Sequence, residues 1–407
     1  MTFIPFILGG VQSDFARHLA REQREVADLV GELVDGALAA AELDAGDVQT
    51  IHVGNAFGQL FTGQGQLGAM PATVRPALWG VPAARHEAAC ASGSIAILAA
   101  LSELAAGHYD VALVLGVEQE RNVPGEDAAR FLGAAAWVGH EAQGARYPWP
   151  HMFSQIGDAY AERWGLDAAH LTAIAQKNLA NARANPHAQT RTWALDAETF
   201  ADPAKNYVVE GRLRRYDCAQ VTDGGAALVL ASPRYAEAWA ARRGKDLATT
   251  PRILGWGHRT AGLSLAAKLE RSRGGGLLVP HVAEAITDAR GRAGRGVDRI
   301  SAYEVHDCFT TTEYLAIDHL GLTAPGESYK AIESGATART GATPINPSGG
   351  LIGGGHPVGA TGVRMAVDAA QQVAGAAGAT QVEGATTVQT LNLGGSATTV
   401  VSFVIGI

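Results

Sequence analysis

Cysteine is scarce in this chain, and its scarcity limits both the covalent structure and the compartment. Only three cysteines occur among 407 residues, at Cys90, Cys218 and Cys308. An odd and widely spaced set does not form a disulfide framework, so we expect free thiols in a reducing compartment. The N-terminal stretch of residues 1–15 has no basic start and only a short apolar run, which does not fit a secretory signal peptide. These features predict a cytoplasmic protein.

Charge is also sparse, and its balance is acidic. Charged residues make up 18% of the chain and the formal net charge is −8, whereas non-specific nucleic-acid binding needs a basic surface. Residues 212–216 and 268–273 are local basic patches. Each is either a solvated face or a docking point for an anionic ligand such as a nucleotide phosphate. No apolar run is long enough to span a membrane, so the sequence predicts neither a nucleic-acid nor a membrane partner.

Metal-ligand spacing is missing as well. The chain has no CxxC and no HxxxH motif, and these spacings are typical of protein zinc sites. The positions of Cys90, His306, Cys308 and His356 follow no such spacing either. We therefore expect no bound metal.

Short β-type runs alternate with alanine-rich helical stretches, as is typical of an α/β protein. The alternation stops between about residues 119 and 220, where tryptophan, proline, asparagine and arginine gather, and it resumes near residue 251. We predict an N-terminal half over residues 1–250 with an inserted subdomain at about 119–220. A C-terminal half then covers residues 251–407 and closes with two β-rich runs joined by a Gly-Gly turn.

A glycine-rich run, NPSGGLIGGGHPVGATG at residues 346–362, surrounds His356. Seven of its residues are glycine, which allows close backbone approach to a ligand and positive φ angles. A neutral imidazole next to a thiol can take the thiol proton. His356 is therefore a candidate activator of a cysteine nucleophile.

Cys90 is the candidate nucleophile, because it lies where a short strand is expected to turn into the helix of residues 91–107. The positive end of a helix and its free N–H groups stabilise a thiolate, so we expect a lowered thiol pKa. The alternative is a buried structural cysteine, which is common for this residue type.

Two further segments carry candidate site residues. His306 and Cys308 lie in YEVHDCFTTTEY, where a strand meets a helix, and both side chains suit proton transfer. A satisfied core histidine is the alternative for His306, and we expect Asp307 to cap the helix that follows it. In LNLGG, Gly394 offers a backbone amide that could complete an oxyanion hole with the amide of Cys90, or it belongs to an ordinary hairpin turn.

Taken together, these motifs resemble the thiolase superfamily over nearly the whole chain. The resemblance rests on the Cys90 turn, residues 161–189, VTDGGAALVL at 221–230, HDCF and GHPVGATG. HDCF and the lack of a C-terminal CxG cysteine, where this chain has Asn392, are similar to sterol-carrier-protein-type thiolases and archaeal-type acetyl-CoA acetyltransferases.

This resemblance implies two βαβαβαββ halves with a loop domain inserted in the first, layered α-β-α-β-α, in a homodimer or tetramer. It implies acylation of Cys90 by an acyl-CoA, activation by His356 and a first oxyanion hole that includes His306. The amides of Cys90 and Gly394 form the second hole, and Cys308, with a lowered pKa, replaces the missing acid/base. Coenzyme A or acyl-CoA is then a substrate, and no cofactor is held permanently.

The resemblance therefore predicts thiolysis of 3-ketoacyl-CoA, or the reverse Claisen condensation, through an acyl-Cys90 intermediate. The first alternative is a retro-aldolase or C-acyltransferase that works with a small OB-fold/zinc-ribbon partner. The second is a non-catalytic acyl-CoA-binding scaffold. The segment 146–160, with Tyr147, Trp149, His151 and Met152, either borders the acyl pocket or belongs to the core.

Overall fold

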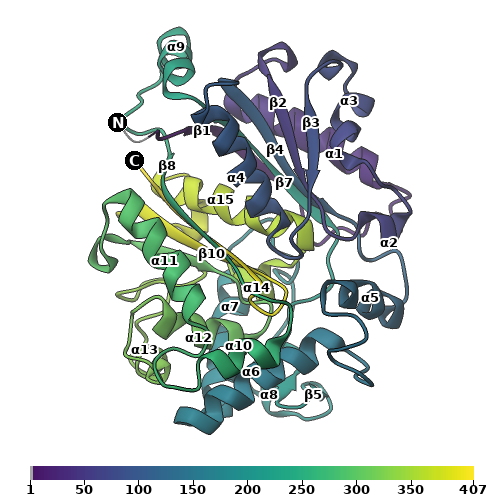
Figure 1. The fold of residues 1–407 in the computed structure, drawn as a ribbon, viewed down its shortest axis with the longest axis vertical. Helices are drawn as coiled ribbons and strands as arrows, with labels where there is room; N and C mark the ends of the chain where they lie inside the picture. Colours follow the sequence, from purple (N-terminus) through teal and green to yellow (C-terminus); the bar gives the residue numbers. More distant parts are fainter. Residues whose placement is uncertain (1–2) are drawn as a thin grey trace.

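The computed structural model describes residues 3–407, and its nine main strands form one mixed sheet with the order β3-β2-β4-β7-β1-β8-β11-β10-β9 (Figure 1). The strands are β1 (Phe6–Gln12), β2 (Thr50–Gly54), β3 (Ala83–His86), β4 (Val111–Glu118), β7 (Gly224–Ala231), β8 (Arg252–Thr260), β9 (Ala302–Val305), β10 (Thr387–Gly394) and β11 (Thr399–Gly406). A single residue pair, Phe6 with Arg252, joins β1 to β8. The sheet is therefore two strand groups that meet at one point.

The two strand groups have the same topology. In the first, β2 is parallel to β3 and β4, whereas β7 is antiparallel to both β4 and β1. In the second, β10 is parallel to β9, and β11 is antiparallel to both β10 and β8. The place of β3 is taken there by an isolated parallel bridge between Tyr303 and Ile345. Cys90 follows β3 and His356 follows Ile345, so the repeat brings both residues to corresponding positions.

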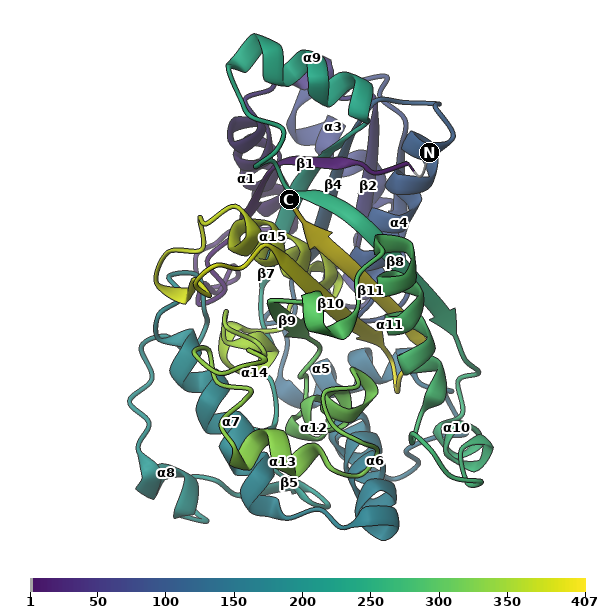
Figure 2. The same cartoon turned by 90° about the vertical axis from the view of Figure 1, so that its left-hand side faces the viewer.

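Helices cover the sheet in layers, as Figure 2 shows. Helix α1 (Val26–Ala41) packs on β1, β4 and β7, and α11 (Pro280–Ala293) packs on β8 and β11. Helices α4 (Ser92–Ala105) and α15 (Thr361–Val373) pack on each other; α4 contacts β2 and β4, and α15 contacts strands of both groups. This arrangement agrees with the predicted α-β-α-β-α layering.

The burial of these residues explains why they form these layers. Every residue of β4, β7 and β10 is buried, as expected for strands covered on both faces. Helix α15 buries twelve of its thirteen residues, Thr361 to Val373 apart from Gln371, because it lies between two sheet surfaces. The part of the chain that carries the first strand group forms three further helices, α2 (Gly58–Thr62), α3 (Met70–Val74) and α9 (Pro233–Arg243).

The segment between β4 and β7 forms a separate region, drawn in blue and teal in the lower part of Figure 1. It contains α5 (Gly125–Leu132), α6 (Pro148–Trp164), α7 (Ala168–Ala182), α8 (Ala197–Ala201) and the short strands β5 (Val208–Glu210) and β6 (Leu213–Arg214). The sequence pattern predicted helices only, and missed the hairpin because its strands have three and two residues. The division into halves at residue 250 stays a prediction.

This inserted region packs on the second strand group's helices rather than on the sheet. Helix α6 contacts α12 (Thr310–His319), and α7 contacts α12, α13 (Ser328–Glu333) and α14 (Gly350–Gly354). Helix α10 (Leu265–Arg271) lies nearby at the end of the same layer (Figure 1). No helix within residues 3–407 is long and apolar enough to cross a membrane; the cytoplasmic location stays a prediction.

Candidate active site

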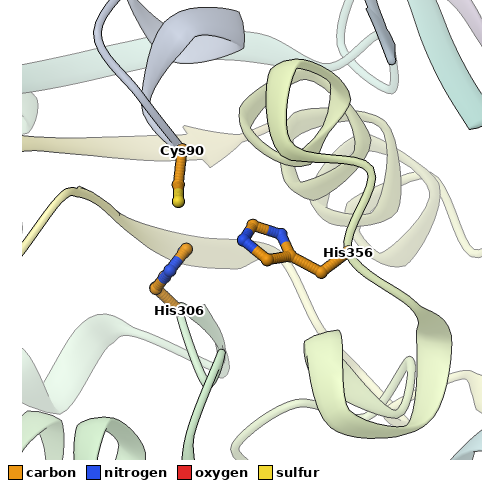
Figure 3. A group of neighbouring side chains, drawn as sticks. All are labelled: Cys90, His306 and His356. Atoms are coloured by element: carbon orange, nitrogen blue, oxygen red, sulfur yellow. The ribbon is translucent and has the colours of Figure 1, made fainter. Parts of the chain in front are cut away.

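Cys90, His306 and His356 come from three separate segments and converge (Figure 3). The Cys90 sulfur and one ring nitrogen of each histidine all lie within 4.8 Å of one another. The two imidazole rings meet edge to face, with centroids 5.2 Å apart. The structure therefore brings together three of the four predicted site residues at one point.

Cys90 lies in a tight turn between β3 and α4. Ala89, just before it, has a φ of 49°, a conformation that costs energy for a residue with a Cβ. The Ser92 hydroxyl holds this turn, because it donates to the Ala89 carbonyl (2.6 Å) and accepts from the Ala88 amide (2.9 Å). The turn fixes the direction of the thiol at the start of α4.

The thiol pKa of Cys90 is raised to about 12, chiefly by burial and then by the negative charge of Glu120. The backbone amides of Gly395 and of Cys90 itself act in the opposite direction, but less strongly. The expected lowering by the helix N-terminus is therefore wrong for the unliganded site. Desolvation outweighs the helix because a buried thiolate loses its hydration.

His356 is poised as a base, and its tautomer follows from one hydroxyl. With the Thr361 hydroxyl donating its single proton to the Pro357 carbonyl (3.2 Å), we assign His356 Nδ1–H as the donor and the hydroxyl oxygen as the acceptor of the 2.6 Å contact. Nε2 of His356 then carries the free lone pair. Burial and the Arg364 charge lower the pKa of His356 to about 3, which keeps the ring neutral.

His306 has the opposite tautomer. Nδ2 of Asn392 lies 3.2 Å from His306 Nδ1, and an amide NH2 only donates, so Nδ1 is the acceptor and Nε2 carries the proton. The Ser94 hydroxyl donates to Oδ1 of Asn392 (2.8 Å) and so fixes the orientation of the amide. Nε2 of His306 has no hydrogen-bond partner within residues 3–407, and burial lowers the pKa of this ring well below its usual range.

This arrangement gives Asn392 and Ser94 functions that the sequence analysis did not find. From the sequence, Asn392 marks only the position of a missing cysteine. The signal in the sequence was its place two residues before Gly394 on a strand, but which ring it faces depends on the pairing of β9 with β10. A donor nitrogen at His306 beside an acceptor nitrogen at His356 makes the pair chemically asymmetric.

Thiol and imidazole groups in such a cluster are also the ligand types that zinc prefers. Here the His306 nitrogen that faces the cluster is protonated by virtue of its tautomer, and it would have to lose that proton to bind a metal ion. The cluster fits proton transfer better than metal binding. The expectation of no bound metal stays a prediction.

Cys308 lines the same cavity as Cys90 and His356. Its Sγ lies 3.8 Å from the Thr312 hydroxyl, and the residue is buried. Burial, followed by the neighbouring Cys90, raises the pKa of the Cys308 thiol well above its usual range. The expected lowering by neighbours is therefore wrong, because the cavity wall desolvates this thiol too. Cys218, which the sequence analysis left out of the site, lines this cavity as well.

Asp307 does not cap the helix that follows it, so that prediction is wrong. Helix α12 begins after Phe309 without a side-chain cap. The Asp307 carboxylate instead accepts the backbone N–H groups of Leu351 (2.6 Å) and Ile352 (3.3 Å) at the start of α14. It thereby fastens the HDCF segment to the glycine-rich run that carries His356.

The turn between β10 and β11 forms the wall of the site beside Cys90. Among the backbone amides, that of Gly395 does most to lower the pKa of the Cys90 thiol, and it lies one residue beyond the predicted Gly394. A Cβ on Gly394 would come within 2.2 Å of the Ala88 carbonyl, so glycine is required there for close packing. The role of the Gly394 amide stays a prediction.

Lys268 holds this turn from behind. The predicted basic patch at 268–273 placed it on the surface, but it is 4% exposed. Its Nζ donates to Ser396 Oγ (2.7 Å), Thr398 Oγ1 (2.8 Å) and the Leu263 carbonyl (3.0 Å). Burial lowers the pKa of Lys268 to about 8. The three donors of its ammonium are all used inside the protein, so Lys268 cannot dock an anionic ligand.

The segment 146–160 divides between cavity wall and core. Tyr147 and Trp149 line the cavity that contains Cys90. Met152 is buried in the core, whereas His151 is half-exposed and hydrogen-bonds Gln155. The contact with the cavity is thus made by Tyr147 and by one side of α6, through residues 148–150 and Phe153.

Comparison with known proteins agrees with this architecture. The family model described as "Thiolase, N-terminal domain" matches residues 6–234, and the one described as "Thiolase C-terminal domain-like" matches residues 268–407. The chain is 30% identical over 375 residues to an acetyl-CoA acetyltransferase of Methanothermobacter thermautotrophicus, covering 91% of each protein. It is 27% identical over 406 residues to human sterol carrier protein 2, covering 96% of this chain and 69% of that protein.

Solved structures share the fold. The structure described as an Ltp2-ChsH2(DUF35) aldolase superposes with a TM-score of 0.77 at 20% identity, over 99% of this chain and 97% of that one. Human mitochondrial 3-ketoacyl-CoA thiolase superposes with a TM-score of 0.71 at 16% identity, over 99% and 98%. At such identities the likeness shows the fold alone. Together, the domain matches and the relatives confirm the resemblance, and the chain belongs to the thiolase family as an acyltransferase.

Proposed function

We propose that this protein transfers acyl groups between coenzyme A and Cys90, in the thiolysis of 3-ketoacyl-CoA or in the reverse Claisen condensation. The convergence of Cys90, His306 and His356 within 4.8 Å beside a mainly apolar cavity carries this proposal. A nucleophile, a base with a free lone pair and a protonated donor are the three groups that acyl transfer needs.

In the first step, His356 Nε2 takes the proton of Cys90 as the sulfur bonds to the carbonyl carbon. The raised pKa of the thiol and the lowered pKa of His356 oppose a resting thiolate–imidazolium pair. Proton transfer therefore accompanies attack. His306 Nε2–H donates to the oxygen that becomes negative, and the amides of Cys90 and Gly394, or of Gly395, serve the carbonyl oxygen of the acyl-enzyme.

When the carbon–carbon bond of the 3-ketoacyl group breaks, its electron pair stays on the departing α-carbon. Cys308 gives that carbon its thiol proton, which leaves acetyl-CoA, a Cys308 thiolate and a protonated His356. The thiol of coenzyme A then loses its proton to Cys308 and attacks acyl-Cys90. The released Cys90 sulfur takes back the proton from His356, so that every group returns to its starting state.

Intact-protein mass spectrometry after incubation with acyl-CoA tests this proposal. The expected result is a mass increase of one acyl group on Cys90, lost in Cys90→Ala and kept in the matched variant Cys218→Ser, which changes another thiol of the same cavity. Absence of any acyl adduct in the wild-type protein would overturn the proposal and leave the retro-aldolase and the acyl-CoA-binding scaffold as alternatives.

A retro-aldolase that works with a small OB-fold/zinc-ribbon protein is the second candidate. It is motivated by the structural likeness to the aldolase whose description includes a DUF35 component. Retro-aldol cleavage needs no cysteine nucleophile, so activity that survives in Cys90→Ala and requires such a partner would favour it.

We also propose that the protein forms a homodimer through β3. This strand is the edge of the sheet, and its residues Ala83 and Ala84 are exposed. An unpaired edge with small side chains is suited to pairing with a second copy. Light scattering during size-exclusion chromatography should give twice the chain mass, and Ala84→Pro should reduce it.

A further inference from the structure

The cavity beside Cys90 has a volume of about 270 Å³ and mainly apolar walls. Its side chains include Phe57, Leu132, Trp149, Phe153, Phe309 and Val358. Glu120 is the one acidic residue that lines it, among the residues that the structure describes. A carboxyl group in an apolar acyl pocket is costly unless something pairs with it.

Glu120 follows the end of β4 and is only 1% exposed. Its Oε1 accepts the backbone N–H of Val358 at 3.1 Å. The charges that act on it most strongly, Glu118 and Asp223, are acidic and together with burial raise the pKa of Glu120 well above its usual range. Burial and these acidic neighbours favour the protonated form of the side chain, which has one O–H donor.

The nearby Glu118 serves as a comparison, because its carboxyl group has a purely structural role. The Glu118 carboxylate accepts from the Asn55 amide and from the backbone N–H groups of Ala56, Phe57 and Gly359. Glu118 lies outside the cavity wall, and its oxygens are fully engaged. Glu120 accepts the Val358 N–H in the turn after His356, and the Thr222 N–H also acts on it; unlike Glu118, it lines the cavity wall.

Glu120 also lies close to the reacting sulfur. Both residues line the same cavity, and Glu120 is the group that, when ionised, most strongly raises the pKa of the Cys90 thiol after burial. An acyl group bound to Cys90 must extend from that sulfur into the cavity that Glu120 lines. The first few carbons of the acyl chain would pass this carboxyl group.

We propose that Glu120 donates a hydrogen bond to an oxygen on the transferred acyl group. The preferred substrates are acyl-CoAs with a hydroxyl or keto oxygen a few carbons beyond the thioester carbonyl. The inference rests on the proposed acylation of Cys90. An acyl chain without this oxygen would leave the buried O–H without a hydrogen-bond partner. The free-energy cost of that missing hydrogen bond disfavours acyl-CoAs that lack the oxygen.

The experiment compares how fast hexanoyl-CoA and the 3-, 4- and 5-hydroxyhexanoyl-CoAs load Cys90, followed by intact-protein mass spectrometry. For the wild-type protein, at least one hydroxylated donor should react about ten-fold faster than hexanoyl-CoA, the worth of one hydrogen bond. In Glu120→Met, which has a similar volume and no donor, this ratio should fall to about one. Glu120→Gln keeps an N–H donor and an acceptor for Val358, so it should retain part of the preference.

The matched control is Gln220→Met, which removes the other polar side chain of carboxyl or amide type from the cavity wall and should leave the ratio unchanged. Thermal unfolding of each variant checks that it folds. If Cys90 is loaded but the ratio is the same in wild type, Glu120→Gln and Glu120→Met, the inference about Glu120 is overturned while the acyltransferase proposal stands. If no donor loads Cys90, the proposed function itself fails.

Discussion

Asn392 Nδ2 lies 3.2 Å from His306 Nδ1, and this contact decides which nitrogen of His306 faces Cys90 with a proton. In most thiolases, this position holds the cysteine of the C-terminal CxG motif. In this chain it holds an amide that acts on the site through a histidine. Mutation of a residue that orients a ligating or donating group commonly lowers affinity or activity ten- to a hundred-fold.

Replacing Asn392 with alanine should therefore slow acylation of Cys90 by about ten- to a hundred-fold, because His306 loses the donor that fixes its tautomer. KM should change little, since Asn392 does not line the cavity. Stopped-flow release of coenzyme A measures the rate. Ser94→Ala should slow acylation less, because it removes only the hydrogen bond that orients the Asn392 side-chain amide. A loss of rate in Ser94→Ala that equals or exceeds the loss in Asn392→Ala would contradict this prediction.

Thr361→Val should lower kcat about ten-fold, because the hydroxyl that accepts from His356 Nδ1 is lost and Nε2 is no longer kept free of its proton. Thr361→Ser keeps the hydroxyl and should keep the activity. Steady-state thiolysis of a 3-ketoacyl-CoA measures both variants. If serine and valine were equally impaired, packing of α15 rather than the hydroxyl would be responsible.

The alkylation of Cys90 by iodoacetamide should depend steeply on pH. With a thiol pKa of about 12 and a His356 pKa of about 3, the thiolate fraction should rise about ten-fold per unit between about pH 7 and about pH 10. A resting thiolate–imidazolium pair would instead give a rate that is flat over this range. Peptide mapping of the modified residue, with Cys90→Ala as control, distinguishes the two.

Asp307→Ala should destabilise the protein by about 1–2 kcal/mol, because the N–H groups of Leu351 and Ile352 lose their cap. Urea unfolding measures the change. Asp298→Ala is the control, since this exposed residue makes only a surface ion pair with Arg299. The same destabilisation in both variants would argue against the cap.

Lys268→Met should reduce the acylation rate about ten-fold, because the turn that carries Gly395 loses its hydrogen bonds from Lys268 to Ser396 and Thr398. Lys330→Met, at an exposed position of α13, is the matched control and should be neutral. Single-turnover acylation with saturating acyl-CoA is the measurement. A pure KM effect would place the role of Lys268 in substrate binding instead.

The strands and helices were largely predictable, because their residues alternate or repeat with the periods that burial imposes. The expected helix at 91–107 contains α4, the apolar run at 111–118 forms β4, and the helical apolar spacing at 24–43 contains α1. The helix α15 was not predicted. Its polar stripe of Arg364, Asp368 and Gln372 is buried together with its apolar residues, so the pattern expected of a surface helix does not describe its surroundings.

The sequence alone determined the family, the α/β repeat and the candidates Cys90, His306, Cys308 and His356, since each lies in a short motif. Only the tertiary structure decided their protonation states. Burial raises the pKa of both thiols, against the expectation from the helix N-terminus. Thr361 and Asn392 set the two histidine tautomers, Asp307 caps a distant helix, and Glu120 lines the acyl cavity. Desolvation and hydrogen-bond partners depend on segments far apart in the chain, and no local pattern encodes them.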